Sequence, residues 1–267
     1  MKRAWIISVG NEILEGRVVN TNLAWLGRRL TFLGFLVERA VAVRDDCEEI
    51  ALTFSEAVAR ADLVVSTGGL GPTFDDMTVP CAARGLGLGV RLSEEALRMV
   101  REKYESAGLE MTEHRRKMAI LPEGAKPLYN PVGTAPGVLL EVRGTLVVML
   151  PGVPSEMKAI FEREVEPVLR SVGTPVYVAE RVLTCRGVPE SSAAPLIEMV
   201  MKRHARVYIK SHPSGSELGE PVLRIHLSAS GDSPGEAESN VLSALNSLEE
   251  LLREAGGEIE VSESWST

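Results

Sequence analysis

Two adjacent aspartates at the end of a glycine-rich turn carry the strongest chemical signal in the sequence. The stretch DLVVSTGGLGPTFDDMT covers residues 62–78, and Asp75 and Asp76 lie near its end. Its apolar run, Leu63–Val65, is typical of a strand buried on both faces of a parallel sheet. A strand, a glycine turn and a helix start form the usual phosphate site of open α/β sheets. Two carboxylates would repel phosphate there, so the stretch indicates a phosphate site that includes a metal ion.

Helix capping is the alternative role for the two aspartates. Acidic residues near a helix start gain about 0.3–1 kcal/mol from the helix dipole, but one acid would suffice for that. The second acid stands near Thr78, and we expect Glu12 and Glu156 from neighbouring loops to face it. This pattern favours Mg²⁺ or another hard divalent cation, with Asp75, Asp76 and Glu156 as its predicted ligands. Such an ion would bridge phosphate oxygens and position a water for attack on a phosphoanhydride.

Four polar segments rich in glycine and proline are predicted to meet at one edge of a sheet. They cover residues 10–12, 67–78, 130–137 and 151–156. Three of them directly follow predicted buried strands, at 4–9, 63–66 and 146–150. Loops that follow parallel strands all emerge at the carboxyl edge, where such folds bind ligands. Ordinary turn geometry and helix capping would explain any one of these loops, but three at one edge favour a ligand site.

Other common ligand and catalytic motifs do not fit the sequence. The turn at Gly68 lacks the lysine of a GxxxxGK[ST] phosphate loop, and the GxGxG glycines at 85–89 follow no predicted strand. There is no GxSxG serine elbow, and the four histidines lack metal-ligand spacing. The basic stretch Arg115–Lys117 is typical of a solvated helix face. Within it, Lys117 is the residue predicted to reach phosphate, with Arg115 as the weaker candidate.

The bulk composition is typical of a globular protein, and we expect no nucleic-acid or membrane partner. The 267 residues include 37 acidic and 29 basic side chains, a net charge of −8 that disfavours nucleic-acid binding. No apolar stretch approaches membrane-spanning length. Cys47, Cys81 and Cys185 are odd in number, far apart and in no CxxC pair. That spacing argues against disulfides or a zinc site, and it predicts a cytoplasmic protein.

The order of predicted elements indicates two domains, 1–172 and 173–267. In the first, strands and helices alternate, which predicts an α/β fold with a mostly parallel sheet between layers of helices. Its helices are expected at 20–33, 47–60, 77–85, 93–107 and 154–169, and its strands at 4–9, 36–43, 63–66, 138–142 and 146–150. Asp45 and Asp46 are candidate caps of the helix at 47–60. A boundary at 171–175 precedes a small α+β domain with a mixed sheet, a hairpin loop over 211–220 and a frayed tail at 262–267. Its strands are expected at 176–184, 206–211 and 221–229, and its helices at 190–203 and 234–255.

Several motifs together resemble the CinA family, in order and in spacing. They are GNEILEG and NTN within 10–22, TGGLGPTFDDMT, KMAILPEGA at 117–125, NPVGTAPG, and LPGVPSEM at 150–157. The resemblance implies, over residues 3–170, the molybdopterin-binding fold that CinA shares with MogA and MoaB proteins. Residues 176–260 resemble the KH-like domain that follows in CinA proteins, although the absence of a GxxG loop argues against RNA binding. The chain is expected to end before the nicotinamide-nucleotide amidase domain of longer CinA proteins.

The resemblance also implies a set of site residues. Asp76 matches the essential aspartate of the related adenylyltransferases, with Asp75 and Lys117 as further catalytic candidates. Phe74 stands where a polar residue is common, which is a departure from the family pattern. The residues implied to bind substrate are Gly10, Asn11, Glu12, Asn22, Thr67, Gly68, Gly69, Gly71, Thr73, Thr78, Asn130, Gly133, Thr134, Ala135, Pro151, Gly152, Pro154 and Glu156.

The activity that follows from the resemblance is metal-dependent hydrolysis of ADP-ribose-like or FAD-like dinucleotides. Mg²⁺, Mn²⁺ or Co²⁺ is the expected cofactor, with potassium as a further candidate ion, and a homo-oligomer is expected. Two alternatives remain open: adenylylation of molybdopterin, which rests on the shared fold alone, and a non-catalytic module that binds a nucleotide or pterin.

Overall fold

The computed structural model describes residues 2–172, 177–214 and 220–262. The chain divides into two compact units, Met1–Thr174 and Pro175–Thr267, each with its own hydrophobic core. The division expected from the sequence lay at 172/173. Most of its boundary segment falls outside the described residues, as do residues 215–219 of the predicted hairpin loop and 263–267 of the predicted tail.

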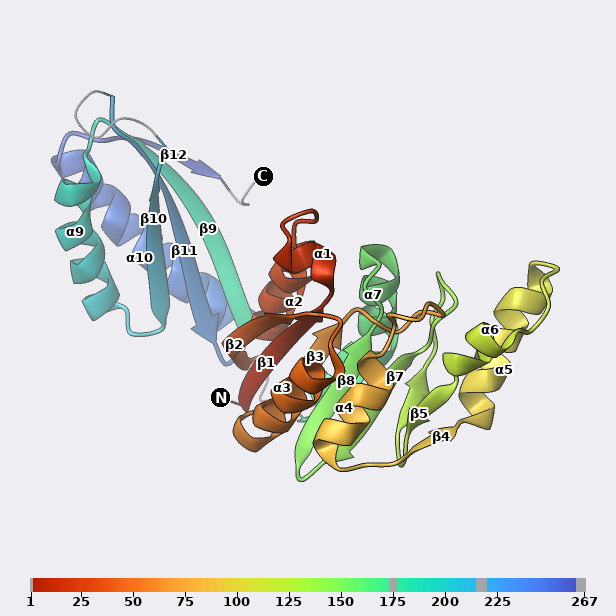
Figure 1. Ribbon diagram of the computed structural model, residues 1–267. Helices are drawn as coiled ribbons and strands as arrows, with labels where there is room; N and C mark the ends of the chain where they lie inside the picture. The colour runs from red at the N-terminus through yellow and green to blue at the C-terminus, as the bar shows by residue number, and fades with distance from the viewer. Residues whose placement is uncertain (1, 173–176, 215–219, 263–267) are drawn as a thin grey trace. The chain divides into compact units, whose positions relative to one another are not determined.

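The first unit is built on a six-stranded sheet with the order β2-β1-β3-β8-β7-β6 (Figure 1). The strands are β1 (Lys2–Val9), β2 (Phe35–Val43), β3 (Leu63–Thr67), β6 (Lys126–Leu128), β7 (Gly137–Val142) and β8 (Thr145–Leu150). The four strands β2, β1, β3 and β8 run parallel, which confirms the predicted α/β fold. Strand β7 is antiparallel to β8, and the edge strand β6 is antiparallel to β7. The change of direction follows from the two-residue turn at Arg143 (φ 54) and Gly144 (φ 83), because a tight turn can join only antiparallel strands.

Helices cover both faces of this sheet. On one face lie α3 (Cys47–Arg60), α4 (Thr78–Leu86) and α5 (Glu94–Ser106); on the other lie α2 (Thr21–Phe32), α7 (Pro154–Ile160), the π-helix η1 (Phe161–Val165) and α8 (Glu166–Val172). The single helix predicted over 154–169 is therefore interrupted by a π-helical segment. Short elements fill the connections: α1 (Asn11–Leu14), α6 (Glu113–Lys117), β4 (Val90–Leu92) and β5 (Ile120–Pro122). Within the described ranges, no helix is long and apolar enough to cross a membrane.

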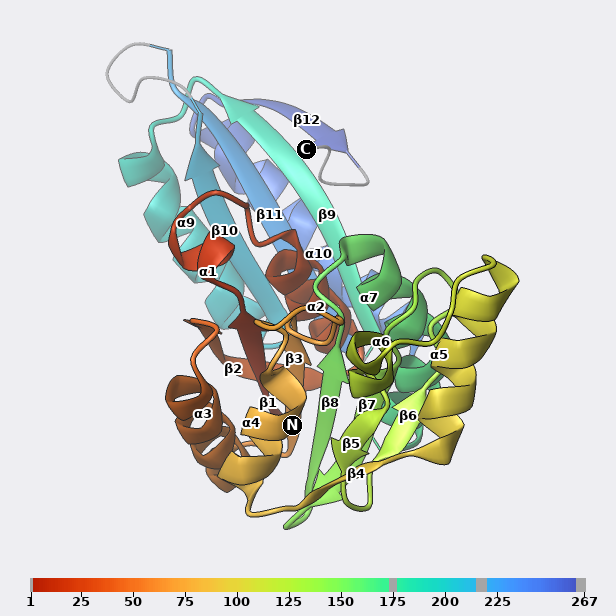
Figure 2. The ribbon, with the colours of Figure 1, turned by 45° about the vertical axis from the view of Figure 1, so that its right-hand side comes forward.

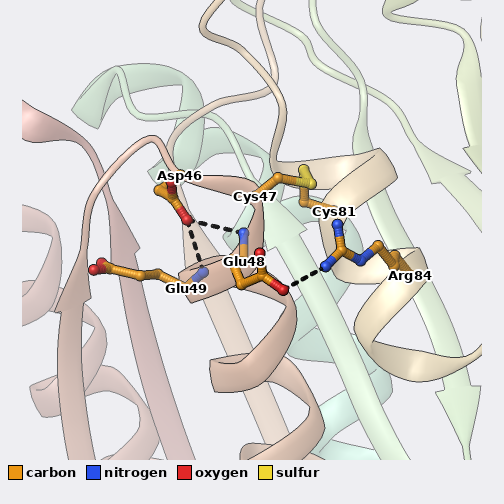
Figure 3. The surroundings of a disulfide bond; sticks show 6 residues. All are labelled: Asp46, Cys47, Glu48, Glu49, Cys81 and Arg84. Atoms are coloured by element: carbon orange, nitrogen blue, oxygen red, sulfur yellow. Dashed lines mark hydrogen bonds and ion pairs between the residues drawn. A yellow bond between two sulfur atoms is a disulfide. The ribbon is translucent and has the colours of Figure 1, made fainter.

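The prediction that the cysteines form no disulfide is wrong. Cys47 and Cys81 are joined by a disulfide with a Cα–Cα distance of 5.0 Å, although 34 positions separate them in the sequence (Figure 3). The two residues lie in the first turns of α3 and α4, which pack side by side on the same face of the sheet (Figure 1). Sequence spacing does not reveal such a pair, because helix packing brings the two first turns together. The argument from cysteine usage for a reducing cytoplasm therefore no longer applies.

The second unit is a four-stranded sheet with two helices on one face (Figure 2). The sheet order is β10 (Val207–Pro213), β11 (Val222–Gly231), β9 (Tyr177–Arg186) and β12 (Glu258–Ser262), and the helices are α9 (Glu190–Arg203) and α10 (Pro234–Glu254). All of its strand pairs are antiparallel, so the predicted mixed sheet is wrong. The sequence interpretation also missed β12. Its five residues, EIEVS, include three polar ones, and they lack the long apolar run that marks the other strands.

Glu166 forms the best-buried ion cluster of the first unit. Its side chain is only 8% exposed and accepts hydrogen bonds from the guanidinium groups of Arg29 on α2 (2.6 and 2.8 Å) and Arg170 on α8 (2.6 and 3.0 Å). Burial by itself would raise the pKa of the Glu166 carboxyl, but the bonds from the two arginines outweigh it and hold the pKa below its ordinary value. The cluster therefore fastens α2 to the helical segment that follows β8.

We expect Glu166→Gln to lower the free energy of unfolding by about 1.5–3 kcal/mol at pH 7, the usual range for hydrogen bonds to a charged group. Because the pKa of Glu166 is lower in the folded state, the ionised carboxyl stabilises the fold above about pH 4.5. That contribution disappears as the pH falls through the lowered pKa. Urea unfolding at several pH values should therefore show the difference between wild type and variant shrinking below pH 4.5.

Glu56→Gln is the matched control. Glu56 also lies near two arginines, Arg39 (3.0 Å) and Arg60 (3.4 Å), but its side chain is 44% exposed. Exposed pairs contribute about 0–1 kcal/mol, so this variant should change stability less than Glu166→Gln. Equal losses in both variants would contradict the role assigned to burial.

Candidate functional site

The loops that carry the predicted site residues emerge at one edge of the large sheet. The parallel strands β1, β2, β3 and β8 end at Val9, Val43, Thr67 and Leu150, and each is followed by a loop at this carboxyl edge. The segment before β7 reaches the same edge because β7 runs antiparallel to β8, with Val138 opposite Met149. Five chain segments therefore meet where open α/β sheets bind ligands.

A pocket of about 380 Å³ lies at this edge. It is called the acidic pocket below, because five carboxylates line it: Glu12, Asp45, Asp75, Asp76 and Glu156. The remaining lining residues are Val9, Gly10, Gly68, Gly69, Leu70, Gly71, Pro72, Thr134, Ala135, Pro151, Gly152 and Val153. None of these described lining residues is a lysine, arginine or histidine. Like charges raise the free energy of such a pocket unless a cation offsets them.

Asp75 and Asp76 are held by the side chain of Thr73. Its hydroxyl lies within hydrogen-bond distance of both carboxylates, 2.6 Å from Oδ2 of Asp76, and its backbone N–H donates to the same Oδ2 at 2.8 Å. The hydrogen bond from Thr73 lowers the pKa of the Asp75 carboxyl, and the backbone N–H of Asp75 and the Lys117 ammonium act in the same direction. Neither aspartate caps α4, whose N-cap is Met77 with no side-chain bond, so capping does not explain them.

Glu156 is held by the side chain of Asn130 and lies beside Gly133. The buried amide of Asn130 donates to Glu156 Oε2 at 2.7 Å and to the carbonyl of Ala135 at 2.9 Å. Its Oδ1 accepts from the backbone N–H groups of Val132 (3.1 Å) and Gly133 (2.8 Å), which shapes the loop. A Cβ at Gly133 would lie 2.0 Å from Glu156 Oε2. A side chain at position 133 would displace the Glu156 carboxylate from the position in which Asn130 holds it.

Gly68 directly follows β3 and contacts the ends of β1 and β8. Its N–H donates to the carbonyl of Leu150 at the end of β8 (3.0 Å), and its φ of 101° is a conformation that favours glycine. A Cβ there would stand 2.1 Å from the carbonyl oxygen of Val9 at the end of β1. Thr78 then fixes the turn, because its hydroxyl donates to the Gly68 carbonyl at 2.8 Å.

An apolar slot of about 180 Å³ adjoins the acidic pocket. The two share Gly69, Leu70, Gly71 and Asp76. The other walls of the slot are Val79, Pro80, Val90, Lys117, Met118, Ile120, Leu121, Pro136 and Val138. Lys117 brings a cation to this slot, where its Nζ donates to the backbone carbonyl of Thr73 at 2.6 Å. It is thus connected to the loop of the two aspartates from the side of the slot, and its contact with phosphate stays a prediction.

Several predicted site residues support the pocket without lining it. Thr73, Thr78, Asn130 and Gly133 make the bonds and contacts described above, and the backbone N–H of Asn11 donates to Asp45 Oδ2 at 3.0 Å. Asn22, Thr67 and Pro154 line a smaller neighbouring hollow, where the Asn22 amide donates to the Gly152 carbonyl at 2.8 Å. Arg115 points elsewhere, with its guanidinium 4.1 Å from the ring centre of Tyr104.

Asp45 is a pocket residue that the sequence interpretation assigned to another role. Asp45 and Asp46 were both interpreted as caps of α3, but only Asp46 accepts from Glu48 N (2.9 Å) and Glu49 N (3.0 Å). Asp45 instead lines the acidic pocket and accepts from Asn11. The signal was a second pair of aspartates between a strand and a helix, which precedes Asp75 and Asp76 by one strand in the sequence.

The predicted ligand set Asp75, Asp76 and Glu156 does not form a ready-made metal centre. Across the described residues there is no group of three or more His, Cys, Asp or Glu side chains placed to hold one ion. Asp75 and Asp76 converge through Thr73, whereas Glu156 is bound to Asn130. A cation at the two aspartates would therefore need further oxygen ligands from water or from a bound phosphate.

The fold and the pocket define an α/β protein with an acidic ligand pocket at the carboxyl edge of its sheet. The family model described as "Probable molybdopterin binding domain" matches residues 5–171. The chain belongs to this family.

Relatives of the chain extend over nearly its whole length. A protein of Pyrobaculum calidifontis is 57% identical over 253 residues, which is 95% of this chain and 97% of the relative. A protein of Aeropyrum pernix is 52% identical over 262 residues and covers 98% of both chains. The crystal structure of the protein CinA, of unknown function, from Thermoplasma acidophilum is 49% identical with a TM-score of 0.60, over 63% of this chain and 98% of that one. The expected resemblance to CinA is confirmed.

We expect Gly68→Ala to destabilise the fold more than a comparable glycine substitution elsewhere. Gly108 is the control, since its φ of 70° is also positive but a Cβ there would meet open space. The left-handed conformation alone costs about 1–2 kcal/mol, which is the loss expected for Gly108→Ala. Gly68→Ala should lose about 1–3 kcal/mol more, because its Cβ meets backbone that must shift.

Chemical denaturation of both variants measures this difference. Equal losses for Gly68→Ala and Gly108→Ala would show that the ends of β1, β3 and β8 can separate without cost.

Proposed function

We propose that the protein is a metal-dependent pyrophosphatase that hydrolyses ADP-ribose-like or FAD-like dinucleotides. The observation that carries this proposal is the charge of the acidic pocket: five carboxylates and no basic side chain among its described lining residues. The carboxyl edge of the sheet is a typical position for a phosphate site. Because the carboxylates would repel a bare diphosphate, a diphosphate could enter this pocket only with a divalent cation. Both features are met by a metal–diphosphate complex.

The apolar slot supports a ligand that carries a flat ring beside its phosphates. Its walls are mostly aliphatic and proline side chains, and it opens next to Gly69, Gly71 and Asp76 of the acidic pocket. A nucleobase or flavin ring buries apolar faces and leaves polar edges, which suits a slot with Lys117 at one wall. A ligand that spans both compartments would place its phosphates against the glycine turn.

The residues present suit a hard divalent cation. Asp75 and Asp76 offer carboxylate oxygens within one turn, and Mg²⁺ is usually held by one or two carboxylates together with water and substrate phosphates. Held by Asp75 and Asp76, such an ion would offset the negative charge that builds up in the reaction. This assignment needs no third carboxylate, which agrees with the separate position of Glu156.

In the proposed reaction Asp76 orients and deprotonates the attacking water. Its Oδ2 accepts the backbone N–H of Thr73 and lies beside the Thr73 hydroxyl, so we assign the water to Oδ1. The water oxygen attacks one phosphorus and the bridging P–O bond breaks. With ADP-ribose the products are AMP and ribose 5-phosphate, and the proton passes from Asp76 to solvent.

We expect Asp76→Asn to lower kcat/KM for ADP-ribose by at least about 100-fold, because positioned general bases contribute roughly 10²–10⁴-fold. The assay is release of AMP with Mg²⁺, Mn²⁺ or Co²⁺. Asp46→Asn removes a carboxylate only one residue from the pocket and keeps the cap of α3, since Asn caps as well as Asp. This control should retain wild-type turnover.

Two outcomes would overturn the proposed function. One is full activity of Asp76→Asn, and the other is no turnover of any dinucleotide in a panel that includes ADP-ribose and FAD. Calorimetry that shows nucleotide binding independent of metal, without turnover, would instead favour a non-catalytic binding module.

Adenylylation of molybdopterin is the second candidate function, favoured by the matched family's description as a molybdopterin binding domain. It would use the same two compartments, with the pterin in place of one nucleotide half. If this function is correct, ATP consumption should depend on added molybdopterin. Pterin binding without ATP turnover would count against it.

A further inference from the structure

The Cys47–Cys81 disulfide lies in the helix turns that directly follow two loops of the acidic pocket. Cys47 follows Asp45, a pocket residue that accepts from Asn11 N at 3.0 Å. Cys81 is in the first turn of α4, which begins at Thr78. The backbone N–H of Thr78 donates to the Gly69 carbonyl at 3.1 Å, in addition to the hydroxyl bond to Gly68. The disulfide therefore links the first turns of α3 and α4, and these turns hold the β2–α3 and β3–α4 loops in place.

The bodies of the two helices are held together without the disulfide. Gly85 of α4 lies so close to α3 that a Cβ on it would stand 2.1 Å from the carbonyl oxygen of Ala51. Arg84 and Glu48 add an ion pair at 2.9 Å (Figure 3), with both side chains more than half exposed. Loss of the disulfide would thus leave α3 and α4 packed and release mainly their first turns. Those turns carry the pocket loops.

We propose that the Cys47–Cys81 disulfide is a redox-sensitive clamp that sets the width of the acidic pocket. In the oxidised protein the clamp fixes Asp45 against the turn at Gly68 and Gly69. Reduction frees the first turns of α3 and α4, so both loops become more mobile and bind ligand less tightly. The ligand-affinity part of this proposal rests on the proposed function; the loop-mobility part does not.

The chemical step is thiol–disulfide exchange with a dithiol reductant. Cys47 is the partly exposed partner, whereas Cys81 is buried. A thiolate of the dithiol attacks Sγ of Cys47, which breaks the S–S bond and releases Cys81 as a thiolate that takes up a proton. The second thiol of the dithiol then resolves the mixed disulfide and releases Cys47. Two electrons and two protons pass to the protein, and the dithiol leaves as its own disulfide.

The direct experiment compares the oxidised and reduced forms of the full chain. Thiol titration should find one free cysteine per chain, Cys185, before treatment with dithiothreitol and three after it. In the reduced form, amide hydrogen exchange should accelerate in residues 44–47 and 67–78. The Kd for ADP-ribose with Mg²⁺ should rise at least about fivefold, the lower end of typical coupling between linked sites.

Variants separate the clamp from other effects of reduction. The double variant Cys47→Ser with Cys81→Ser should behave like the reduced wild type with and without dithiothreitol. Glu48→Gln removes the ion pair that joins the same helices but keeps the disulfide, so it should keep the full response to the reductant. Cys185→Ala should also keep it, because this buried thiol belongs to the second unit.

The proposal is overturned if exchange rates in both loops and the Kd are unchanged by reduction, even when the melting temperature falls. That result would make the disulfide a purely structural brace. If the oxidised protein does not bind ADP-ribose, the proposed function fails instead, and hydrogen exchange alone then decides whether the clamp exists.

Discussion

The gathering of five carboxylates in one pocket, without a basic side chain among the lining residues that the structure describes, is the constraint on which the rest of the site depends. Two unit charges 4 Å apart repel by about 1 kcal/mol even in water, and no basic side chain offsets them among the described residues that line the acidic pocket. The protein holds these groups in place with donors instead: Thr73 for Asp75 and Asp76, and Asn130 for Glu156. In the function that we propose, this negative charge would attract the divalent cation that accompanies a diphosphate.

Residues that line the acidic pocket differ from residues that hold its loops and carboxylates in position. Asn130 and Thr78 are predicted ligand contacts because they stand in or next to glycine-rich loops. Both are buried, and their side chains form hydrogen bonds with the loop backbone and, for Asn130, with Glu156. Their role is to fix backbone and carboxylates before any ligand arrives. Preorganisation of this kind matters for catalysis, since a group that is already in position pays no reorganisation cost during the reaction.

The disulfide connects this local order to the packing of the helices. Close approach at Gly85 and Ala51 fixes the distance between α3 and α4, and Cys47 and Cys81 then meet at the pocket ends of the two helices. Disulfides are rare in a reducing cytosol, with intracellular proteins of hyperthermophiles as the exception. The bond therefore places a covalent constraint next to the acidic pocket in a chain whose cysteine spacing suggests none.

Much of the fold and of the site could be predicted from the sequence, because the determining signals are local. Buried strands such as Leu63–Thr67 are marked by apolar β-branched runs, and the loops after them are marked by glycine, proline and acids. Parallel strands share one carboxyl edge, so the meeting of these loops followed from the strand pattern alone. The pairing of Cys47 with Cys81 and the pocket position of Asp45 did not follow, nor did the separation of Glu156 from the two aspartates. These depend on how helices pack and where side chains point, and tertiary contacts between distant residues decide both.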